Sequence, residues 1–351
     1  MSGGAVLLAS GLPLRAGGAD PPTSFQRQLE LLAGGFRRAG WKARVVGPEE
    51  AQRLAAGAAG WEAAILLGYP DQFPFLLGGR SGLRLYLWAQ CSRPPDPRAF
   101  GEARAVPLTP LTAAFLARAG IRSLGPVIGH AVDTSVFRPL SAEQRARTRR
   151  ALAVEGCFVV GAVGANSYRK RFDLILSAFA LYAESRPESR LLIKTDRTIS
   201  REGTDLCILV RRFGIADRVR VLTDELSAVR MRELYGALDL FVNLSEWEGF
   251  GLPVAEAMAC GLPVVTHRVQ GPGELAPCAE LVAEDSLAHE EGGSRLLEAR
   301  PPTVAGLLAR AADDPELRRK ASELSLREAR SRFELQGIVE RWRSLITADR
   351  G

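Results

Sequence analysis

The chain has few of the residues that build metal centres and disulfide frameworks. Its 351 residues include only five cysteines and three histidines. The cysteines are scattered at positions 91, 157, 207, 260 and 278, with no Cys-x-x-Cys pair and no cluster with histidine. The sequence therefore predicts neither a zinc site nor disulfides, and it favours a reducing, cytoplasmic compartment.

Long apolar runs and an Asp-x-Asp motif are also absent. No uninterrupted apolar run reaches the roughly 18 residues that cross a bilayer. The first residues lack the basic and then apolar pattern of a signal peptide, so we expect none. Apolar residues make up 46% of the chain and charged residues 25%, which is typical of a globular protein. The length predicts two domains, each able to bury a core.

The net charge of +6 lies entirely in the first part of the chain. Residues 1–140 contain 15 Lys and Arg against 9 Asp and Glu, whereas residues 141–351 contain 31 of each. A basic face can bind an anionic acceptor or an anionic lipid surface. Solvated cations at helix C-termini are the commoner explanation of such a face. No aromatic-studded basic strand or recognition motif points to nucleic acid.

Strand and helix signals alternate along the chain, which is typical of parallel α/β sheets. In the first part we expect strands at Ala5–Ser10, Ala43–Val46, Ala63–Leu67, Leu83–Trp88 and Ala105–Pro107. In the second part we expect them at Phe158–Val163, Leu191–Lys194, Val219–Leu222, Leu240–Asn243 and Pro263–Val265. Helices are expected to begin at a cap formed by Ser24 and at Thr109, which is followed by Pro110.

The most informative segment is Ser245–Val265, which reads SEWEGFGLPVAEAMACGLPVV. It follows a buried strand whose loop is expected to begin near Asn243. Gly249 and Gly251 allow tight backbone conformations and a close approach of N–H groups to a ligand. Pro253 suits the first position of a helix that we expect to run to Cys260, because its missing N–H would have no partner there.

Two carboxylates flank this double glycine, Glu248 in the loop and Glu256 in what we expect to be the first helical turn. The N-terminus of the helix is an anion site that would suit a diphosphate. Glu256 could then reach a pair of ribose hydroxyls, and Glu248 would lie near a sugar attached to the diphosphate. An ordinary strand, loop and helix with a capping glutamate is the alternative.

At these residues the chain resembles the retaining glycosyltransferases of family 4, which have the GT-B fold. Gly271–Glu274 is similar to the glycine-rich turn of that family, and Gly161–Phe179 is similar to its basic phosphate loop and following helix. Val127–Pro139 is similar to the segment that closes its first domain. The likeness covers nearly the whole chain and is stronger in the second half.

The resemblance implies an α/β fold with two Rossmann-like domains whose parallel sheets face a central cleft. It implies an acceptor-binding domain at residues 1–140 and a nucleotide-sugar-binding domain at residues 141–332. Residues 333–351 would form a C-terminal helix that crosses back to the first domain. The first domain of such enzymes often meets the membrane, so we expect a cytoplasmic protein that can lie on the inner membrane face.

The implied reaction transfers a sugar from a nucleoside diphosphate to an acceptor hydroxyl, with retention of configuration and without metal or another cofactor. Glu248 would orient the donor sugar, while Lys170 and Arg169, in the basic run 169–171, would stabilise the diphosphate. Further donor-binding residues are expected at Gly249, Phe250, Gly251, Leu252, Glu256 and His267, and after the first strand at Gly17 and Gly18, where a plain flexible turn is the alternative.

The chain departs from the family pattern in both domains. The family commonly has Arg after the Val-Gly of the second domain's first strand, where this chain has Ala165, and Arg169 would compensate. The family often has a histidine after the fourth strand, where this chain offers only Gln90 or Ser92 for the acceptor or sugar. His130 could also reach these ligands, although a structural role at the domain junction is the stronger reading.

Two other functions stay open. Ala165 and the missing histidine would also suit a catalytically silent subunit that binds a nucleotide sugar. A phosphorylase or a nucleotide-sugar epimerase could use the same fold. A pyridoxal-phosphate phosphorylase would need a lysine in a recognisable context, and none of the four lysines has one. The acceptor, whether anionic, lipid-linked or neither, is not specified by the sequence.

Overall fold

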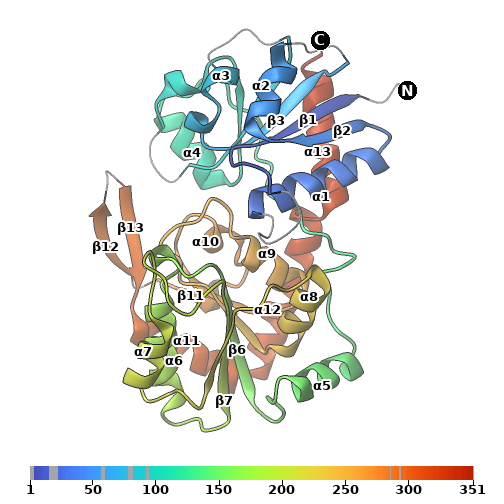
Figure 1. Cartoon of the computed structure of the whole chain (residues 1–351). Coiled ribbons are helices and arrows are strands. Elements are labelled where there is room, and N and C mark those ends of the chain that lie inside the picture. Colours follow the sequence, from blue (N-terminus) through green and yellow to red (C-terminus); the bar gives the residue numbers. More distant parts are fainter. Residues whose placement is uncertain are drawn as a thin grey trace. The chain divides into compact units, whose positions relative to one another are not determined.

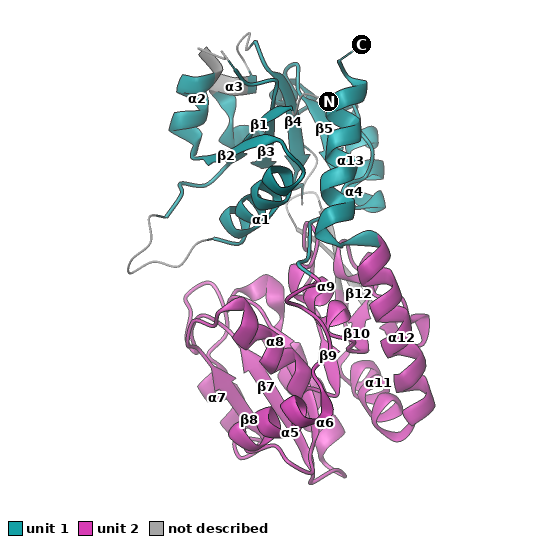
Figure 2. Ribbon diagram, turned by 90° about the vertical axis from the view of Figure 1, so that its right-hand side faces the viewer, with its two compact units in different colours: residues 1–133, 332–351 teal, residues 134–331 magenta. Residues whose placement is uncertain are grey.

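The protein has two compact units, and each is described by itself (Figure 1; Figure 2). In the computed structural model, the described residues are 4–15, 23–56, 60–77, 82–91, 95–284, 286–291 and 294–350. Unit 1 comprises Met1–Asp133 with Arg332–Gly351, and unit 2 comprises Thr134–Ser331. The sequence placed these divisions at 140 and 332. Among the described residues, no helix is both long and apolar enough to cross a membrane.

Unit 1 contains a five-stranded parallel sheet in the order β2-β1-β3-β4-β5. Its strands are β1 (Ala5–Ser10), β2 (Lys42–Val46), β3 (Ala63–Gly68), β4 (Arg84–Ala89) and β5 (Arg104–Pro107). All five predicted strands are confirmed, with ends within one residue of the prediction. The central strand β3 is buried along its whole length, as expected of a strand covered on both faces.

Helices cover this sheet, and two of the longer ones begin at side-chain caps. The helical elements are α1 (Ser24–Arg38), α2 (Pro48–Ala56), η1 (Pro70–Gln72), α3 (Pro74–Leu77), η2 (Pro97–Phe100), α4 (Pro110–Arg118) and α13 (Leu335–Ala348). Thr109 caps α4 and Pro110 follows it, as predicted. The expected cap at Ser24 was wrong, because the Thr23 side chain accepts the hydrogen bond from the Gln26 N–H and Ser24 is already helical.

The last helix of the chain, α13, belongs to unit 1. Figure 1 shows it, coloured red, beside the blue elements from the start of the chain. Trp342 is fully buried, with its ring 5.5 Å from that of Trp88 and 6.0 Å from that of Tyr86. Asp349, just after the helix, accepts hydrogen bonds from the Tyr86 hydroxyl at 2.8 Å and from Arg104 at 2.6 Å. The end of the chain therefore completes the core of the first unit.

Unit 2 contains a six-stranded parallel sheet in the order β11-β10-β9-β6-β7-β8. Its strands are β6 (Phe158–Val163), β7 (Ser189–Lys194), β8 (Val219–Leu222), β9 (Leu240–Val242), β10 (Val264–His267) and β11 (Val282–Ala283). The five predicted strands are confirmed. The sequence missed β11, which is too short to show a pattern, and the antiparallel hairpin of β12 (Ser286–Glu291) and β13 (Ser294–Ala299), whose polar residues and glycines obscure the strand signal.

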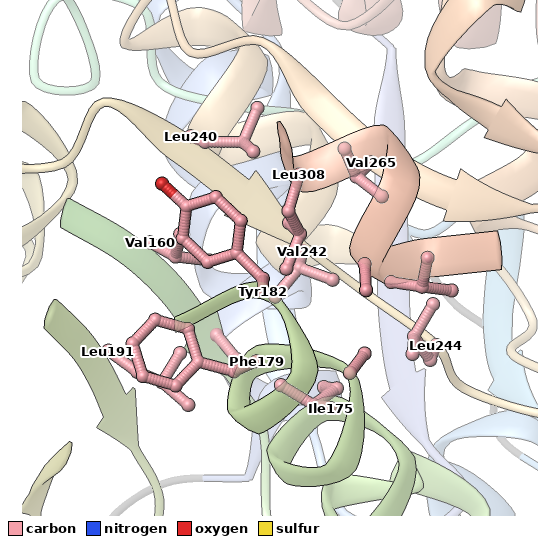
Figure 3. Close-up of a cluster of buried hydrophobic side chains, with 14 of the residues drawn as sticks. Val160, Ile175, Phe179, Tyr182, Leu191, Leu240, Val242, Leu244, Val265 and Leu308 are labelled. Atoms are coloured by element: carbon pink, nitrogen blue, oxygen red, sulfur yellow. The ribbon is translucent and has the colours of Figure 1, made fainter. Parts of the chain in front are cut away.

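A large apolar core holds the sheet of unit 2 against its helices (Figure 3). The helical elements are α5 (Ala142–Ala151), η3 (Tyr168–Lys170), α6 (Phe172–Ala183), α7 (Leu206–Arg212), α8 (Ala228–Ala237), α9 (Leu252–Ala259), α10 (Pro272–Leu275), η4 (Ala279–Leu281), α11 (Pro301–Asp313) and α12 (Pro315–Arg332). Figure 3 shows Phe179 and Tyr182 of α6 and Leu308 of α11 packed on Val160 and Val242 of the sheet. This packing fixes the strands whose loops form the site.

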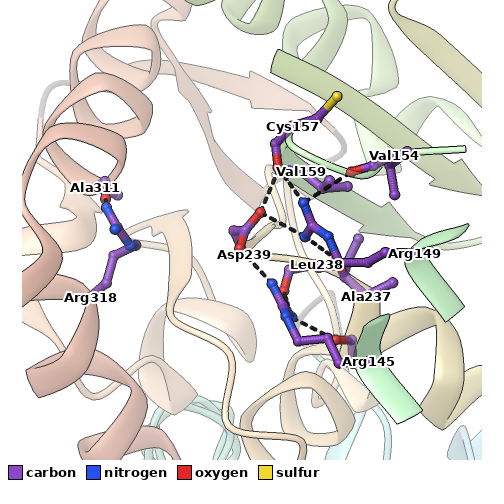
Figure 4. Close-up of polar contacts among 11 residues, drawn as sticks. Arg145, Arg149, Val154, Cys157, Val159, Ala237, Leu238, Asp239, Ala311 and Arg318 are labelled. Atoms are coloured by element: carbon purple, nitrogen blue, oxygen red, sulfur yellow. Dashed lines mark hydrogen bonds and ion pairs between the residues drawn. The ribbon is translucent and has the colours of Figure 1, made fainter. Parts of the chain in front are cut away.

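Polar contacts fix the amino ends of β6 and β9 (Figure 4). The Asp239 carboxylate, directly before β9, accepts hydrogen bonds from Arg145 at 2.6 Å and from Arg149 at 3.1 Å. It also accepts one from the Val159 N–H at 2.8 Å. Both arginines lie on α5, which has no buried residue of its own. Asp239 therefore connects α5 to the two central strands of the sheet.

Candidate functional site

The strand order of unit 2 predicts where a ligand would bind. From β6 the chain proceeds outward through β7 and β8, and it then returns to the other side of β6 to form β9, β10 and β11. In open parallel sheets, ligands bind at the carboxyl ends of the strands where the order reverses in this way. The loops after β6 and β9 lie at this point, and they carry Lys170 and Glu248.

The Glu248 carboxylate is the centre of this region. Its side chain is 8% exposed, and its Oε1 accepts hydrogen bonds from Lys170 Nζ at 2.7 Å, Ser245 Oγ at 2.8 Å and Asn243 Nδ2 at 3.1 Å. The guanidinium of Arg169 lies 4.0 Å from the other oxygen, Oε2. The sequence predicted Glu248, Lys170 and Arg169 as one group, and the structure brings them together.

Charge keeps this buried carboxylate ionised. Burial alone would raise the pKa of Glu248, but the charges of Lys170 and Arg169 outweigh burial and lower the pKa to about 2. Burial lowers the pKa of Lys170, while the Glu248 charge acts in the opposite direction. The site therefore contains an ionised carboxylate, with the Lys170 amino nitrogen and the Arg169 guanidinium beside it.

Backbone contacts hold together the loops that follow β6, β9 and β10. The Glu246 N–H donates to the Arg169 carbonyl at 2.8 Å, and the Glu248 N–H donates to the Gln270 carbonyl at 3.3 Å. These three strands are neighbours in the sheet. The spacing between Lys170 and Glu248 is therefore fixed by main-chain contacts as well as by the ion pair itself.

His267, the last residue of β10, contacts the loop after β9. It is fully buried, and its Nε2 is 2.9 Å from the Ser245 carbonyl oxygen. Burial lowers its pKa, so the ring is neutral near pH 7 and holds the loop as a hydrogen-bond donor from Nε2. The sequence led us to expect a direct contact between His267 and the donor, whereas in the structure the ring contacts the Ser245 loop.

Glycines permit the close packing of this loop. Gly251 has φ +97° and Gly271 has φ +82°, both in the left-handed region that favours glycine. A Cβ on Gly271 would lie 2.8 Å from the carbonyl oxygens of both Glu248 and Phe250, and one on Gly251 would lie 3.1 Å from Pro272. The Gly-Phe-Gly and Gly-Pro-Gly-Glu motifs therefore form two turns in direct contact.

The helix after this turn, α9, begins earlier than the sequence predicted. It starts at Leu252, because Gly251 in the left-handed conformation turns the chain directly into the helix. Pro253 is thus the second helical residue rather than the first, and Glu256 lies in the second turn rather than in the first. Pro253 has no N–H, and the Val254 N–H donates to the Gly251 carbonyl at 2.9 Å, so the first N–H of α9, that of Leu252, is the one suited to an anion.

Glu256 is held by a residue that no sequence pattern indicated. The hydroxyl of Tyr235, on α8, donates to Glu256 Oε2 at 2.9 Å. Tyr235 is fully buried, and burial together with the Glu256 charge raises its pKa well above the usual value. The neutral hydroxyl therefore fixes the direction of the Glu256 carboxylate.

The basic run 169–171 does not act as one group. Arg169, with its side chain 35% exposed, lies over the Trp247 ring with its guanidinium carbon 5.1 Å from the ring centre. Lys170 contacts Glu248. Arg171 instead contacts three other carboxylates, on Asp173, Glu246 and Glu298. Of the three cations, only Arg169 and Lys170 therefore lie beside Glu248.

A second residue that the sequence did not reveal, Asn166, organises the loop after β7. Its side chain is buried, and its amide nitrogen donates to the carbonyls of Arg197, Thr198 and Thr204 at distances from 2.7 to 3.2 Å. Asn166 lies in the loop after β6, four residues before Lys170. It therefore fixes the loops that follow two neighbouring strands, at the same edge of the sheet as Glu248.

Two of the predicted residues of unit 1, Gln90 and His130, lie next to each other. Gln90 follows β4, and its Nε2 lies 3.3 Å from Nε2 of His130. His130 is buried with its ring 4.7 Å from that of Trp88, and burial lowers its pKa to about 3. The structure thus brings Gln90 and His130 together as a neutral pair. Gly17, Gly18 and Ser92 lie outside the described residues.

No metal centre is evident in the part of the chain that the structure describes. Within those residues, no three or more His, Cys, Asp or Glu side chains are grouped so that they could hold a metal ion.

Part of the second unit matches the model of a known protein family. Residues 144–299 match the family model for glycosyl transferases group 1. The lipopolysaccharide core biosynthesis mannosyltransferase LpsB of Rhizobium meliloti (strain 1021) is 29% identical over 187 residues, which cover 51% of this chain and 52% of LpsB. The chain spans about half the length of the curated relatives it matches, or less.

Solved structures resemble the chain over nearly its whole length. A glycosyltransferase from Rickettsia africae ESF-5 aligns with this chain with a TM-score of 0.79 at 12% identity. The alignment covers 99% of each of the two chains. Anabaena Alr3699/HepE in complex with UDP and glucose has a TM-score of 0.73 at 16% identity, with 98% of this chain and 99% of HepE covered. These likenesses confirm the predicted GT-B fold, and the family match supports the group 1 family over residues 144–299.

Proposed function

We propose that this protein is a retaining glycosyltransferase that moves a sugar from a nucleoside diphosphate to an acceptor hydroxyl without a metal ion. The observation that carries the proposal is the buried Lys170–Glu248 pair at the switch point of the unit 2 sheet, with Arg169 beside it. The resemblance of residues 245–265 to retaining enzymes supports the stereochemistry. The UDP and glucose named in the HepE complex support a nucleotide-sugar donor.

The diphosphate of the donor would bind between Lys170, Arg169 and the N-terminus of α9. An ammonium group has three N–H donors, and Glu248 accepts one of those of Lys170. The others can donate to phosphate oxygens without breaking the ion pair. The N–H groups near Gly251 and Leu252 add a partial positive charge. This arrangement supplies fixed cationic groups where other enzymes use a metal.

The sugar and the ribose would each meet a carboxylate. Oε1 of Glu248 already accepts three hydrogen bonds, so Oε2 is the oxygen that would accept from a sugar hydroxyl. The N–H of Phe250 and its neighbours would lie on the same side of the sugar. Glu256, oriented by Tyr235, would accept from the ribose hydroxyls.

In the reaction, the bond between the anomeric carbon and the diphosphate oxygen breaks, and the acceptor oxygen forms a new bond to that carbon on the same face. The hydroxyl proton of the acceptor passes to the departing phosphate, so no protein nucleophile is needed. Negative charge grows on the diphosphate as it leaves, and Lys170 and Arg169 stabilise that charge. Cations that are already positioned before the reaction are effective because they need no reorganisation.

The acceptor we propose is anionic or carried on an anionic lipid surface. In unit 1, the end of α1 and the start of β2 present the exposed cations Arg37, Arg38, Lys42 and Arg44. Each basic residue near an anionic membrane contributes about 1 kcal/mol of attraction. A cosedimentation assay with vesicles of neutral or anionic lipid tests this, and equal binding to both would contradict it.

A binding screen in the presence of EDTA tests the donor site. UDP, GDP, ADP and their common sugar conjugates would be compared by thermal shift and calorimetry, and one should stabilise the protein by about 2.7 kcal/mol at 100 times its dissociation constant. Lys170→Ala and Glu256→Ala should abolish this effect. Lys320→Ala, which removes an exposed lysine paired with Glu280, is the matched control and should not.

Two outcomes would contradict the proposal. If no nucleotide stabilises the protein, the donor site is not a nucleotide site. If a sugar nucleotide binds but is never hydrolysed or transferred, and Glu248→Ala changes nothing, the protein is a binding subunit rather than an enzyme.

A further inference from the structure

Arg171 has a backbone conformation that is unusual for a residue with a Cβ. It follows Lys170 directly and has φ +49° and ψ +45°, in the left-handed region. Among the described residues, only Ala153 and Arg171 have positive φ without being glycine. Such a conformation persists where the surroundings determine it strongly, and it is frequent at functional sites. The contacts of the side chain show what determines it here.

The Arg171 guanidinium is surrounded by carboxylates. It donates to Glu246 Oε1 at 2.8 Å, to Glu298 Oε1 at 2.7 Å and to both carboxylate oxygens of Asp173 at 3.1 and 2.9 Å. The side chain is only 14% exposed. All of its terminal nitrogens are therefore engaged within unit 2, and none is directed to the diphosphate site proposed above.

These three carboxylates come from three different parts of unit 2. Glu246 lies in the loop after β9, two residues before Glu248. Asp173 lies in the first turn of α6, and Glu298 lies near the end of β13. Arg171 thus connects the turn that carries Lys170 to the loop that carries Glu248, and it connects both to β13.

The charges around Arg171 do not balance. One guanidinium faces three carboxylates, which leaves an excess of negative charge beside an arginine side chain that is only 14% exposed. Without the guanidinium, Glu246 and Glu298 would repel each other, and the loop after β9 would move away from β13. A lysine would keep the charge but could not reproduce the planar, multiple hydrogen bonding of arginine.

We propose that Arg171 is a positioning residue for the transfer reaction, which fixes the relative placement of Lys170 and Glu248 without touching the donor. This inference rests on the proposed function. Stabilisation of the departing diphosphate depends on cations held in place before the reaction. A misplacement of about 1 Å can lower a rate about 100-fold. Arg171 provides a side-chain contact that holds the two loops in addition to the Lys170–Glu248 pair.

The test uses three substitutions and one matched control. Arg171→Gly removes the guanidinium, and glycine accepts the left-handed backbone without strain. Glu298→Gln removes the charge that connects Arg171 to β13, and Arg171→Lys tests conservative rescue. Asp173→Asn is the control, because Asp173 also contacts Arg171 but lies only two residues away on the same segment.

The measurements separate positioning from stability and from binding. Hydrolysis or transfer of UDP-glucose, UDP-N-acetylglucosamine, GDP-mannose and ADP-glucose gives kcat and KM. Calorimetry with the matching nucleoside diphosphate gives Kd, and thermal unfolding gives Tm. We expect Arg171→Gly and Glu298→Gln to lower kcat about tenfold or more, with Kd changed by less than about threefold. Arg171→Lys should recover part of kcat, and Asp173→Asn should resemble the wild type.

Other results would contradict either the proposed function or the positioning role of Arg171. If the wild-type protein turns over none of these donors, the proposed function is wrong, and the role of Arg171 is lost with it. If the wild type is active and Arg171→Gly or Glu298→Gln keeps its full kcat, only the positioning role is wrong. Equal losses in Asp173→Asn and Glu298→Gln would also contradict that role. If Arg171→Gly does not fold, Glu298→Gln decides.

Discussion

The ion pair between Lys170 and Glu248 should contribute to the stability of unit 2 as well as to the proposed chemistry. The pKa of Glu248 falls from an ordinary 4.5 to about 2. At about 1.4 kcal/mol per pKa unit, this corresponds to about 3 kcal/mol of interaction that favours the charged form. Both side chains are less than a tenth exposed, so solvent screens little of this energy.

A double-mutant cycle measures this interaction. Glu248→Gln alone should destabilise unit 2 by about 3 kcal/mol or more, because it leaves the Lys170 ammonium buried beside Arg169. Lys170→Met alone leaves the carboxylate without its nearest cation. The double variant removes both charges, so its loss of stability should be smaller than the sum of the single losses by about 1 to 3 kcal/mol. Urea unfolding of the nucleotide-free protein, followed by hydrogen exchange in β6 and β9, reports on unit 2 alone.

The dependence on pH provides a second check of the same cycle. Because the pKa of Glu248 is lowered in the folded state, its contribution is present above pH 4.5 and is lost as the pH falls from 4.5 towards 2. The interaction energy should therefore be smaller at pH 3 than at pH 7. Additive losses at pH 7, within about 0.5 kcal/mol, would refute the reasoning, because they would mean that the pair contributes no net interaction.

Three further predictions concern other residues of unit 2. Tyr235→Phe should weaken binding of the nucleoside diphosphate about tenfold in calorimetry, because it removes the hydrogen bond that orients Glu256, and unchanged affinity would disprove this. Asp239→Asn should lower the free energy of unfolding of unit 2 by about 3 kcal/mol in urea, and a normal value would show that its two arginines contribute nothing net. Gly271→Ala should cost about 2 kcal/mol or more, because of its positive φ and the 2.8 Å contact with the Glu248 carbonyl, and a wild-type Tm would contradict this.

The sequence predicted the sheets well because their central strands are buried on both faces. A run such as Ala63–Gly68, in which every residue is apolar or Gly, has few alternatives to a central parallel strand. The two residues of β11 cannot show a pattern, and the hairpin of β12 and β13 was missed because its polar residues and glycines suggest a loop. Prediction therefore succeeded where burial dictates composition and failed where strands are short or polar.

The candidate site was predictable in part for a related reason. Lys170 and Glu248 each follow a predicted strand, and parallel strands bring their carboxyl ends to one edge of a sheet, so proximity could be inferred. The contact of Tyr235 with Glu256 could not, because it joins a helix to a helix and no spacing rule relates them. The direction of Arg171 could not be inferred either, because nothing in the letters Arg-Lys-Arg indicates a left-handed backbone at the third residue.

The three cations of the basic run 169–171 have different carboxylate partners, and this difference indicates where a diphosphate would bind. Lys170 has a single carboxylate at 2.7 Å and Arg169 has the same one at 4.0 Å, whereas Arg171 has three. A diphosphate is attracted to cations whose charge is not already neutralised, so it would bind beside Arg169 and Lys170 and not at Arg171. Arg171 would then keep its carboxylates in every step of the proposed reaction. Two adjacent residues of the same charge sign can thus have different tasks, one in contact with the leaving group and one in holding the loops around it.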